Sequence, residues 1–596
     1  MTDLGNEKFK INYCKTNELD LEYLKLEEVS NTIDKTNGYE PFAISMLQNY
    51  NPIYSLFFEM NDSNYNHISL NNRYHFVNMK TVESLEEKDR HNQDVFIKFS
   101  PLVDPVRYMI GKFKNSADKM VVLPNLTNRA ECLENVIDPN NAAYTDCFFS
   151  YLSSQLLHQH GFVHGIDFYG SFLGVQKKFK ANVTDDLEYL NNSTHFKDNV
   201  GVLFAVSETQ TKELLQYGSR GNKKKLVIST LSNDHNISAI SILDIESSEN
   251  KNNENADDGE LVYNKSIRSK SSSSSSSDDS DKSDLNYTSD EGEGDEDDDD
   301  EDDDDDDDDE DDEDEDDEDD DKDEEEEDED DEDDDKDEEE EEEEEIFAYI
   351  NDFPMQMICL EKCKGTIDEL FEKDMFDNKE GASAMMQLLM TLITYQKAFH
   401  FTHNDLHTNN IMYIETDQPF LYYIYNGKYY KVPTYGKIYK IIDFGRSIYK
   451  YQGKLFCSNS FASGGDAATQ YNFEPYMDEN KPRLEPNMGF DLCRLGCSIF
   501  DFMMEIDDDP RDLDDFQETI NRWCLDDNGK NFLYKKNGDE RYPNFKLYKM
   551  IARTAHKHLP HEQLDYPFFA QFEIAWKKMK KIDSSIMNID KIPAYI

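Results

Sequence analysis

The sequence predicts an α+β protein that is interrupted by a long acidic segment. Segments such as DVFIKFSPL (94–102) and YKIIDFGRS (439–447) are rich in β-branched and aromatic residues and favour strands. Other segments have apolar residues at helical spacing, such as AAYTDCFFSYLSSQLLHQHG (142–161) and SAMMQLLMTLITYQKAFHF (383–401). The first of these ends in a glycine, which is typical of a helix C-terminus. Both kinds of element occur on each side of the acidic segment.

Charge is distributed very unevenly along the 596 residues. Between Glu291 and Glu345 the chain has 51 acidic residues and two lysines, which is a net charge of −49 out of a total of −68. With the serine-rich stretch before it, this segment forms a low-complexity region over 246–345. We expect the region to be disordered, because it has almost nothing apolar to bury and its like charges repel.

Two interpretations of this acidic region stay open. It could tether basic partners or compete with basic peptides. The simpler interpretation, which we favour, is an expanded repeat that the fold tolerates. A long insertion is inexpensive, since the free energy of closing a loop rises by only about 0.6 kcal/mol for each doubling of its length.

The composition argues against several classes of protein. No Lys/Arg-rich run is present, which argues against a nucleic-acid partner. No run approaches the roughly 18 apolar residues that a membrane span needs, and the start MTDLGNEKFKINYC lacks the apolar stretch of a signal peptide. The nine cysteines include no Cys-x-x-Cys pair and indicate free thiols in a reducing compartment. We expect a soluble intracellular protein without a membrane partner.

The polar stretch FTHNDLHTNNIMYI contains the pattern from which we predict the function. Its residues 403–410 read His-x-Asp-Leu-x-x-x-Asn, and an Asp-Phe-Gly triplet follows an apolar strand at 443–445. Phosphoryl transfer from ATP needs a carboxylate that orients the acceptor hydroxyl and takes its proton. It also needs a carboxylate and an amide oxygen that hold Mg²⁺ on the phosphates. Asp405 supplies the first group, and Asn410 and Asp443 supply the other two.

The part of the chain that contains these motifs resembles the catalytic lobe of eukaryotic-like protein kinases. The resemblance implies a two-lobed protein-kinase fold with a small β-rich N-lobe, a larger helical C-lobe and the acidic insertion in the N-lobe. It divides the chain into an N-terminal extension with the first strands (1–89), the first part of the N-lobe (90–245), the insertion (246–345), and the hinge with the C-lobe (346–596). ATP and Mg²⁺ are the implied cofactors.

The same resemblance implies roles for single residues. Asp405 would be the catalytic base, and Asn410 and Asp443 the metal ligands. His403 would brace the Asp-Phe-Gly turn that Phe444 and Gly445 complete.

Further roles follow from two neighbouring segments. Asp491, in FDLCRLG, matches the buried Asp of the next helix, with Gly496 five residues later. CLEKCKGTIDELF resembles the last N-lobe strand, the hinge and the following helix. Leu360 would then be the gatekeeper, and backbone groups of Glu361 and Cys363 would hold adenine.

A more specific likeness lies in the insert PFLYYIYNGKYYKVPTYGKIYK between the two motifs. Haspin-type kinases have a similar hairpin before their metal-binding Asp. The Asn/Asp/Lys/Tyr-rich composition and the run SFASGGDAATQYNFEPYM are similar to those of serine/threonine kinases of giant DNA viruses. That origin would place the protein in the host cytoplasm or the virion.

Two charged residues before the acidic region match less specific parts of the kinase pattern. Lys98, in VFIKFS, matches the strand lysine that neutralises phosphate charge. A surface lysine whose stem packs along apolar neighbours would have the same local sequence. Asp146, in YTDCFFSYL, is our candidate for the helix acid that pairs with Lys98. The alternative is an acid that only stabilises a helix N-terminus.

Two of the places where the chain departs from the kinase pattern lead to predictions. No Gly-x-Gly-x-x-Gly precedes Lys98, and the best candidate for the phosphate-covering turn is Asn71 and Asn72, which predicts low ATP affinity. The arginine of the catalytic loop is replaced by Asn404. That arginine normally pairs with a phosphate on the activation segment, so its absence predicts activity without phosphorylation there.

Three functions remain open. The first is a kinase that acts on Ser/Thr of proteins, with basic proteins as one class of substrate. The second is a small-molecule phosphotransferase, since such enzymes share the loop motif. The third is a pseudokinase scaffold, which the missing glycine-rich loop suggests. We favour the first, because the long segment before the helix at 490–506 could form a shelf for a polypeptide.

Overall fold

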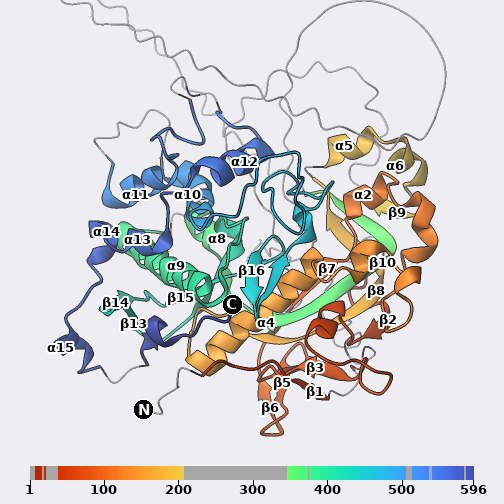
Figure 1. Ribbon diagram of the computed structural model, residues 1–596, viewed down its shortest axis with the longest axis horizontal. Coiled ribbons are helices and arrows are strands. Elements are labelled where there is room, and N and C mark those ends of the chain that lie inside the picture. The colour runs from red at the N-terminus through yellow and green to blue at the C-terminus, as the bar shows by residue number, and fades with distance from the viewer. Residues whose placement is uncertain are drawn as a thin grey trace, which may run out of the picture. The chain divides into compact units, whose positions relative to one another are not determined.

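A five-stranded antiparallel sheet forms the centre of the β-rich part of the protein (Figure 1). Its strands are β2 (Ile44–Gln48), β8 (Phe168–Asn182), β10 (Phe347–Glu361) and β7 (Val95–Pro101) in that order, with β9 (Phe204–Val206) also on β10. The central strand β10 is buried without a break from Phe353 to Leu360. A strand covered on both faces is expected to be mostly apolar, and this stretch is apolar except for the buried Gln356.

The computed structural model describes only part of the chain. The described residues are 7–15, 38–184, 186–206, 345–373, 375–504, 513–535, 540–582 and 585–596, with Leu19, Leu21, Leu24 and Gly538. The region predicted to be a disordered insertion therefore lies outside the described residues, except for Glu345. It falls between β9 and β10, and β8 and β10 are neighbours in the sheet, as expected for an insertion between paired strands. The predicted domain boundaries stay predictions.

Helix α4 (Ala142–His160) packs against this sheet and has the bounds that the sequence predicts. The Asn141 side chain caps its first turn by accepting a hydrogen bond from the Ala143 N–H, and Gly161 ends it in the left-handed conformation with φ of 65°. Such an ending favours glycine, which has no Cβ to oppose a positive φ. Nearly the whole helix is buried, because it contacts β8 and β10 on one side and the helical part of the protein on another.

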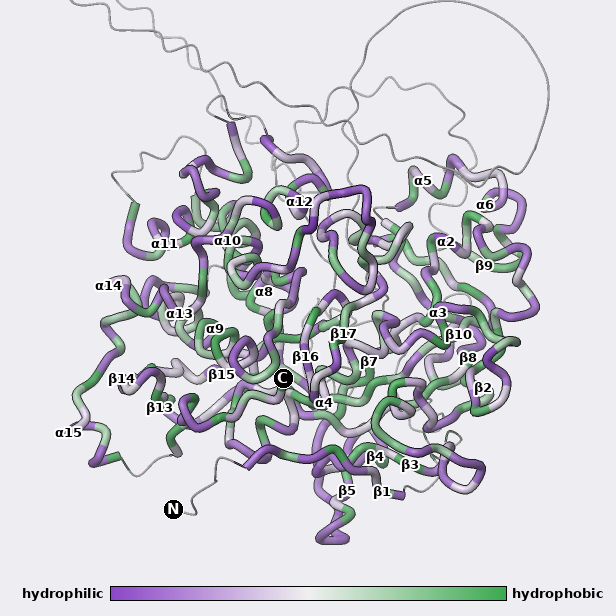
Figure 2. The backbone as a smooth tube through the Cα atoms, viewed as in Figure 1, coloured by the Kyte–Doolittle hydropathy of each residue, from purple (hydrophilic) through white to green (hydrophobic). Residues whose placement is uncertain are grey.

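Helix α9 (Asn378–Phe399) is the core of the helical part. Asp377 caps the start of α9, and the helix is buried from Gly381 through Tyr395. Figure 2 shows hydrophobic stretches, in green, along it. The other helices of eight or more residues here are α10 (Phe490–Met503), α11 (Asp515–Trp523) and α12 (Phe545–Thr554). Shorter ones are α8 (Ile367–Glu372), α13 (Pro560–Gln563), α14 (Pro567–Ala570) and α15 (Trp576–Met579).

Short sheets connect these helices and carry the two sequence motifs. β12 (Ile411–Glu415) pairs with β15 (Lys437–Ile441) and with β11 (Gly365–Thr366), so the two motifs lie at adjacent strand ends. β16 (Ile448–Tyr451) and β17 (Lys454–Cys457) form a hairpin after the second motif.

The insert at 419–440 contains the hairpin that its likeness to haspin-type kinases predicts. β13 (Phe420–Tyr425) pairs with β14 (Lys428–Pro433), and β18 (Met587–Asn588) adds a parallel strand. Asn426 and Gly427 both have positive φ, as a two-residue Asn-Gly hairpin turn requires.

The remaining elements surround the main sheet. β1 (Tyr13–Lys15) pairs with β3 (Ile68–Leu70), and β4 (His75–Asn78), β5 (Thr81–Ser84) and β6 (Asp89–Asn92) form a three-stranded sheet. The short helices are α2 (Pro105–Met109), α3 (Glu134–Ile137), α5 (Leu187–Asn191) and α6 (Thr194–Asn199). Among the described residues, every helix is too short or too polar to cross a bilayer.

We predict that Gly496→Ala destabilises the protein. A Cβ at this position of α10 would lie 2.7 Å from Cβ of Trp523 on α11, and neither atom can move without its backbone. Alanine gains about 1 kcal/mol of helix propensity, but overpacking a core costs about 1–3 kcal/mol. Urea unfolding should show a net loss of about 1–2 kcal/mol. Ser498→Ala in the same helix is the control and should change stability by less than about 0.5 kcal/mol.

Candidate active site

Lys98 lies between two carboxylates that come from distant parts of the chain. Its Nζ is 2.8 Å from Oδ2 of Asp146 on α4 and 2.7 Å from Oδ1 of Asp443. Only 12% of its side chain is exposed, so the description of Lys98 as a surface lysine does not apply. Burial opposes its charge, but the two carboxylates outweigh burial and hold the pKa of Lys98 above its ordinary value. A buried cation of this kind is stable only while both partners are in place.

Asp146 also joins α4 directly to the Asp-Phe-Gly turn. Its Oδ1 accepts a hydrogen bond from the backbone N–H of Phe444 at 3.0 Å. The Phe444 ring packs on Phe149 of the same helix, with 4.6 Å between ring centroids. Burial raises the pKa of Asp146, and Lys98 opposes this rise. Asp146 is thus more than an acid near a helix N-terminus, since it contacts both Lys98 and the turn.

Asp491 holds the backbone of the loop that contains Asp405. The N–H of His403 donates to both carboxylate oxygens of Asp491, at 3.1 and 2.9 Å, and the N–H of Asn404 donates to Oδ1 at 2.9 Å. Nε2 of His403 is 2.9 Å from the carbonyl oxygen of Ile442. This contact connects the loop to the residue before Asp443, and the role of His403 as a brace stays a prediction.

Asn410, in the same loop as Asp405, has a side-chain oxygen that accepts no hydrogen bond from the described residues. Its amide nitrogen donates to the carbonyl of Asp405 at 2.9 Å, so the orientation of the amide is fixed. Its Oδ1 is buried and has no hydrogen-bond partner among the described residues. Leaving a buried acceptor unpaired is costly. The N–H of Ile442 donates to the Asn410 carbonyl, which brings Asn410 next to the strand that leads to Asp443. Amide and carboxylate oxygens suit Mg²⁺, so these residues fit the expected ion.

Two residues in the turn and the loop have positive φ. Asp443 has φ of 61° and Asn404 has φ of 63°. Non-glycine residues seldom adopt this conformation, and such strain is typical of functional sites. Gly445, two residues after Asp443, donates its N–H to Oδ1 of Asp443 at 3.4 Å.

The carboxylate of Asp405 is surrounded by donors. Oδ1 accepts a hydrogen bond from the Tyr548 hydroxyl at 2.7 Å, and Oδ2 is 3.5 Å from a guanidinium nitrogen of Arg446. Burial raises the pKa of Asp405, but Arg446 and the other nearby donors outweigh burial and hold this pKa well below its ordinary value. These groups therefore favour the ionised form of Asp405.

The predicted hinge residues lie at the end of β10 and just after it. Leu360 and Cys363 are buried in the core. Burial raises the pKa of Cys363 to about 12, so it is a protonated thiol. The N–H of Glu361 donates to the Asp167 carbonyl, and its carboxylate contacts Lys440. The N–H of Glu361 is therefore already used, and only its carbonyl could take part in holding a base. This role stays a prediction.

The turn at Asn71 and Asn72, which we expect to cover phosphates, forms hydrogen bonds with other parts of the protein. Oδ1 of Asn71 accepts hydrogen bonds from the N–H of Asn12 and the hydroxyl of Tyr151, and the amide nitrogen of Asn72 donates to the Tyr74 carbonyl. These contacts tie the turn to the N-terminal segment and to α4. None of them associates it with Lys98 or Asp443.

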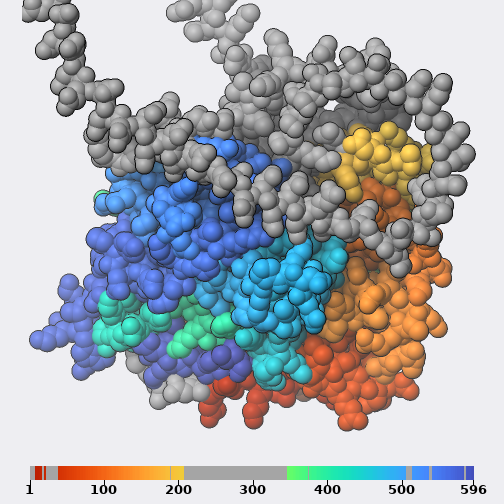
Figure 3. Space-filling view, turned by 45° about the horizontal axis from the view of Figure 1, so that its top comes forward, coloured from red at the N-terminus to blue at the C-terminus, as the bar shows by residue number. Residues whose placement is uncertain are grey.

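The segment 458–489, called here the connecting segment, contacts the loop and α4 through neutral hydrogen bonds, and Arg107 donates to the carbonyl of its Gly464. Oδ1 of Asn404 accepts from the Tyr471 hydroxyl at 2.8 Å, and its amide nitrogen donates to the Arg446 carbonyl at 3.0 Å. Asn459 accepts a hydrogen bond from the N–H of Ala142, the first residue of α4. Figure 3 shows this light-blue part of the chain between the orange and dark-blue parts. Sequence reasoning missed Tyr471 and Asn459.

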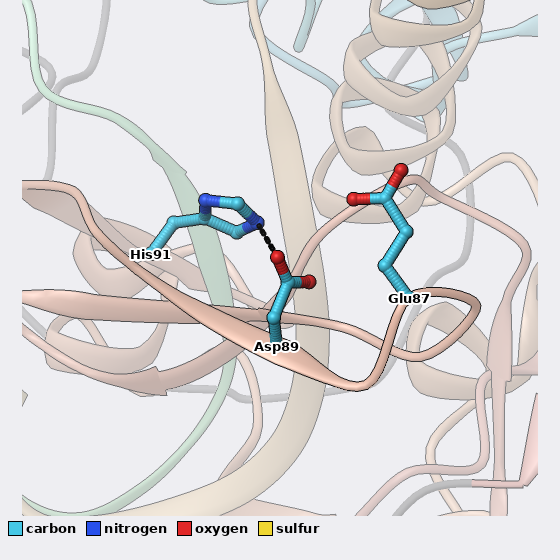
Figure 4. Close-up of side chains that lie close together, drawn as sticks. All are labelled: Glu87, Asp89 and His91. Carbon is cyan, nitrogen blue, oxygen red and sulfur yellow. Dashed lines mark ion pairs between the residues drawn. The ribbon is translucent and has the colours of Figure 1, made fainter.

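A second cluster of charged side chains lies on the β5–β6 hairpin. Glu87, Asp89 and His91 are close enough to share a cation, and Nε2 of His91 is 3.3 Å from Oδ2 of Asp89 (Figure 4). The two acids are exposed, and exposed acids often cluster without an ion. The cluster belongs to a different sheet from Lys98 and is not part of the candidate site.

Comparisons with known proteins identify a distant relationship. A stretch of 126 residues, 20% of the chain, is 33% identical to the serine/threonine-protein kinase haspin of Bos taurus. A stretch of 108 residues, 17% of the chain, is 34% identical to haspin of Mus musculus. The chain is distantly and partially similar to haspin serine/threonine kinases. It spans only 16% and 14% of the lengths of these two haspins. No protein-family model matches the chain.

We predict that Lys98→Met lowers stability in a pH-dependent way. Without the cation, the carboxylates of Asp146 and Asp443 face each other in a buried site, and their folded-state pKa values rise above the unfolded value of about 4. Acids whose pKa is raised by folding destabilise the protein as pH increases. The loss should therefore be small near about pH 4 and reach about 3 kcal/mol near about pH 8.

Thermal unfolding across this pH range measures the effect. Lys450→Met, at an exposed position on β16, is the matched control and should show little change. An equal loss of stability at both ends of the range would contradict the ion-pair explanation.

Proposed function

We propose that the protein is a serine/threonine-protein kinase that uses ATP and Mg²⁺ and has the two-lobed protein-kinase fold. The observation that carries this proposal is the position of Lys98 between Asp146 and Asp443, beside a loop that contains Asp405 and Asn410. A cation and two carboxylates from three separate elements suit the binding of a metal-bound triphosphate. The partial similarity to haspin kinases supports the same proposal.

The chemistry assigns one task to each of the four groups. Lys98 would neutralise phosphate oxygens, and Asn410 and Asp443 would hold Mg²⁺, which supplies the charge that the triphosphate needs. Asp405 would accept the hydrogen bond of a serine or threonine hydroxyl. The hydroxyl oxygen then forms a bond to the γ-phosphorus, the bond from that phosphorus to ADP breaks, and the proton passes to Asp405.

The two-lobed interpretation assigns the described elements as follows. The sheet of β2, β7, β8, β9 and β10 with α4 would be the N-lobe, and the part built on α9 and α10 would be the C-lobe. Residues 361–363 would form the hinge, and the connecting segment would be the activation segment. Its length favours a polypeptide acceptor, and we expect basic proteins among the substrates.

The two alternative functions have weaker support. A pseudokinase scaffold does not need Asp405 to be ionised and Asn410 to present an unpaired oxygen. A small-molecule phosphotransferase shares the same four groups but has no use for a long connecting segment. Both alternatives are tested by the acceptors that the enzyme uses.

We predict that the full-length protein transfers labelled phosphate from ATP to a mixture of basic proteins. Asp405→Ala and Asp443→Ala should each reduce this transfer by about 10³-fold or more, because each removes a group that acts in the transition state. Asp417→Ala, at an exposed loop position, is the matched control and should leave transfer unchanged. Equal incorporation by all four proteins would refute the proposal. Transfer only to sugars or choline-like acceptors would favour the small-molecule alternative.

We also predict that activity does not depend on phosphorylation of the connecting segment. Asn404 forms a neutral hydrogen bond with Tyr471, where an arginine would need a phosphate. Single replacements of Ser458, Ser460 and Ser463 by alanine should leave kcat/KM within about threefold of wild type. Tyr471→Phe removes the hydroxyl and should lower kcat/KM by about tenfold. Loss of activity in the serine variants, with Tyr471→Phe fully active, would contradict this prediction.

A further inference from the structure

Tyr548 contacts the carboxylate of Asp405 although it lies 143 residues away in sequence. It comes from α12, and its hydroxyl donates to Oδ1 of Asp405 at 2.7 Å. The distance is that of a strong hydrogen bond to a charged acceptor. A side chain in this position restricts how the Asp405 carboxylate can rotate.

Tyr548 is itself held in place from two sides. Nε of Arg494, on α10, donates to the Tyr548 hydroxyl at 3.0 Å, so the hydroxyl must direct its own proton toward Asp405. The guanidinium carbons of Arg494 and Arg446 lie 5.1 and 5.6 Å from the centre of the Tyr548 ring. Contacts of this kind between a cation and an aromatic face are attractive. The chain of contacts therefore runs from Arg494 through Tyr548 to Asp405.

Helix α12 is fixed to the rest of the protein, so Tyr548 is not a movable cover. Ile551 and Ala552, in the next turn, are fully buried. The side chain of Asn487 donates to the Ala552 carbonyl at 3.1 Å. The ring of Phe545 stacks on that of Tyr548, with 5.4 Å between centroids. Tyr548 is thus a rigid support for Asp405.

We propose that Tyr548 is a positioning residue, oriented by Arg494, that fixes the carboxylate of Asp405 for the acceptor hydroxyl. The proposal rests on the proposed kinase function. A carboxylate can accept about four hydrogen bonds, so the bond from Tyr548 leaves room for an acceptor hydroxyl. Arg446 binds Oδ2 and Tyr548 binds Oδ1, so the pair holds the plane of the carboxylate. Positioning of this kind lowers the barrier of a transfer reaction.

The test is Tyr548→Phe in the full-length protein, which keeps the ring and removes only the hydroxyl. With a basic protein as acceptor, kcat should fall by about tenfold, because Asp405 loses the hydrogen bond from the Tyr548 hydroxyl and Arg494 loses its acceptor. KM for ATP should stay at the wild-type value, since none of the groups proposed to bind ATP is touched. The melting temperature should fall by a few degrees, because Asp405 and Arg494 each lose a hydrogen bond. Tyr542→Phe, at the residue three positions before the start of α12, is the matched control and should behave as wild type.

A double-variant cycle tests whether Arg494 acts through Tyr548. Arg494→Lys keeps the charge but removes the Nε donor, and it should lower kcat in the wild-type background and have little further effect in Tyr548→Phe. Wild-type kcat in Tyr548→Phe would overturn the inference and leave the proposed function intact. A rise in KM for ATP that accompanies the fall in kcat would show a general structural role and would also overturn it. Absence of transfer in the wild-type protein would overturn the proposed function itself, and this inference with it.

Discussion

The ion pairs of Lys98 are the constraint on which the rest of the site depends. Its side chain is 12% exposed, and removing a cation from water is costly unless carboxylates meet it at short distance. Both Asp146 and Asp443 meet it below 3 Å. These ion pairs link β7 to α4 and to the turn at 443–445. The Phe444 N–H and ring then add contacts to the same helix. One buried charge therefore joins a strand, a helix and a turn.

A second group of contacts consists of neutral hydrogen bonds at Asn404, where the kinase pattern has an arginine that pairs with a phosphate. Asn404, Tyr471 and Asn459 connect the loop, the connecting segment and the start of α4 by neutral hydrogen bonds. Such bonds need no added phosphate to form, and they depend little on salt. The same logic does not extend to Asp405, whose carboxylate stays charged because Arg446 and Arg494 lie near it.

The residues of the candidate site differ in how far their positions could be predicted. The pattern at 403–410 and the triplet at 443–445 depend on short spacings, and the structure brings them to adjacent strand ends. The only sequence signal for Asp146 as the partner of Lys98 was its position in a predicted helix. Its contacts with Lys98 and Phe444 depend on how that helix packs. Tyr548 and Asn459 had no signal at all, since their partners lie 143 and 317 residues away. Asparagine tolerates positive φ, which is the only local signal for a turn at Asn71. The contacts of Asn71 with Asn12 and Tyr151 depend on a strand pair that no local pattern predicts.

The sequence by itself determined which groups could do chemistry: the loop aspartate and asparagine, the turn aspartate and the strand lysine, because their spacing is a local property of one strand, loop or turn. It also determined the bounds of α4 and the turn of the β13–β14 hairpin, because caps and Asn-Gly turns act over a few residues. Only the tertiary structure decided which acid of a helix forms an ion pair with Lys98 and which hydroxyl donates to Asp405. It also decided that the side-chain oxygen of Asn410 has no hydrogen-bond partner among the described residues. Those choices depend on how helices rotate against a sheet, and burial of the whole core sets that rotation rather than any single segment.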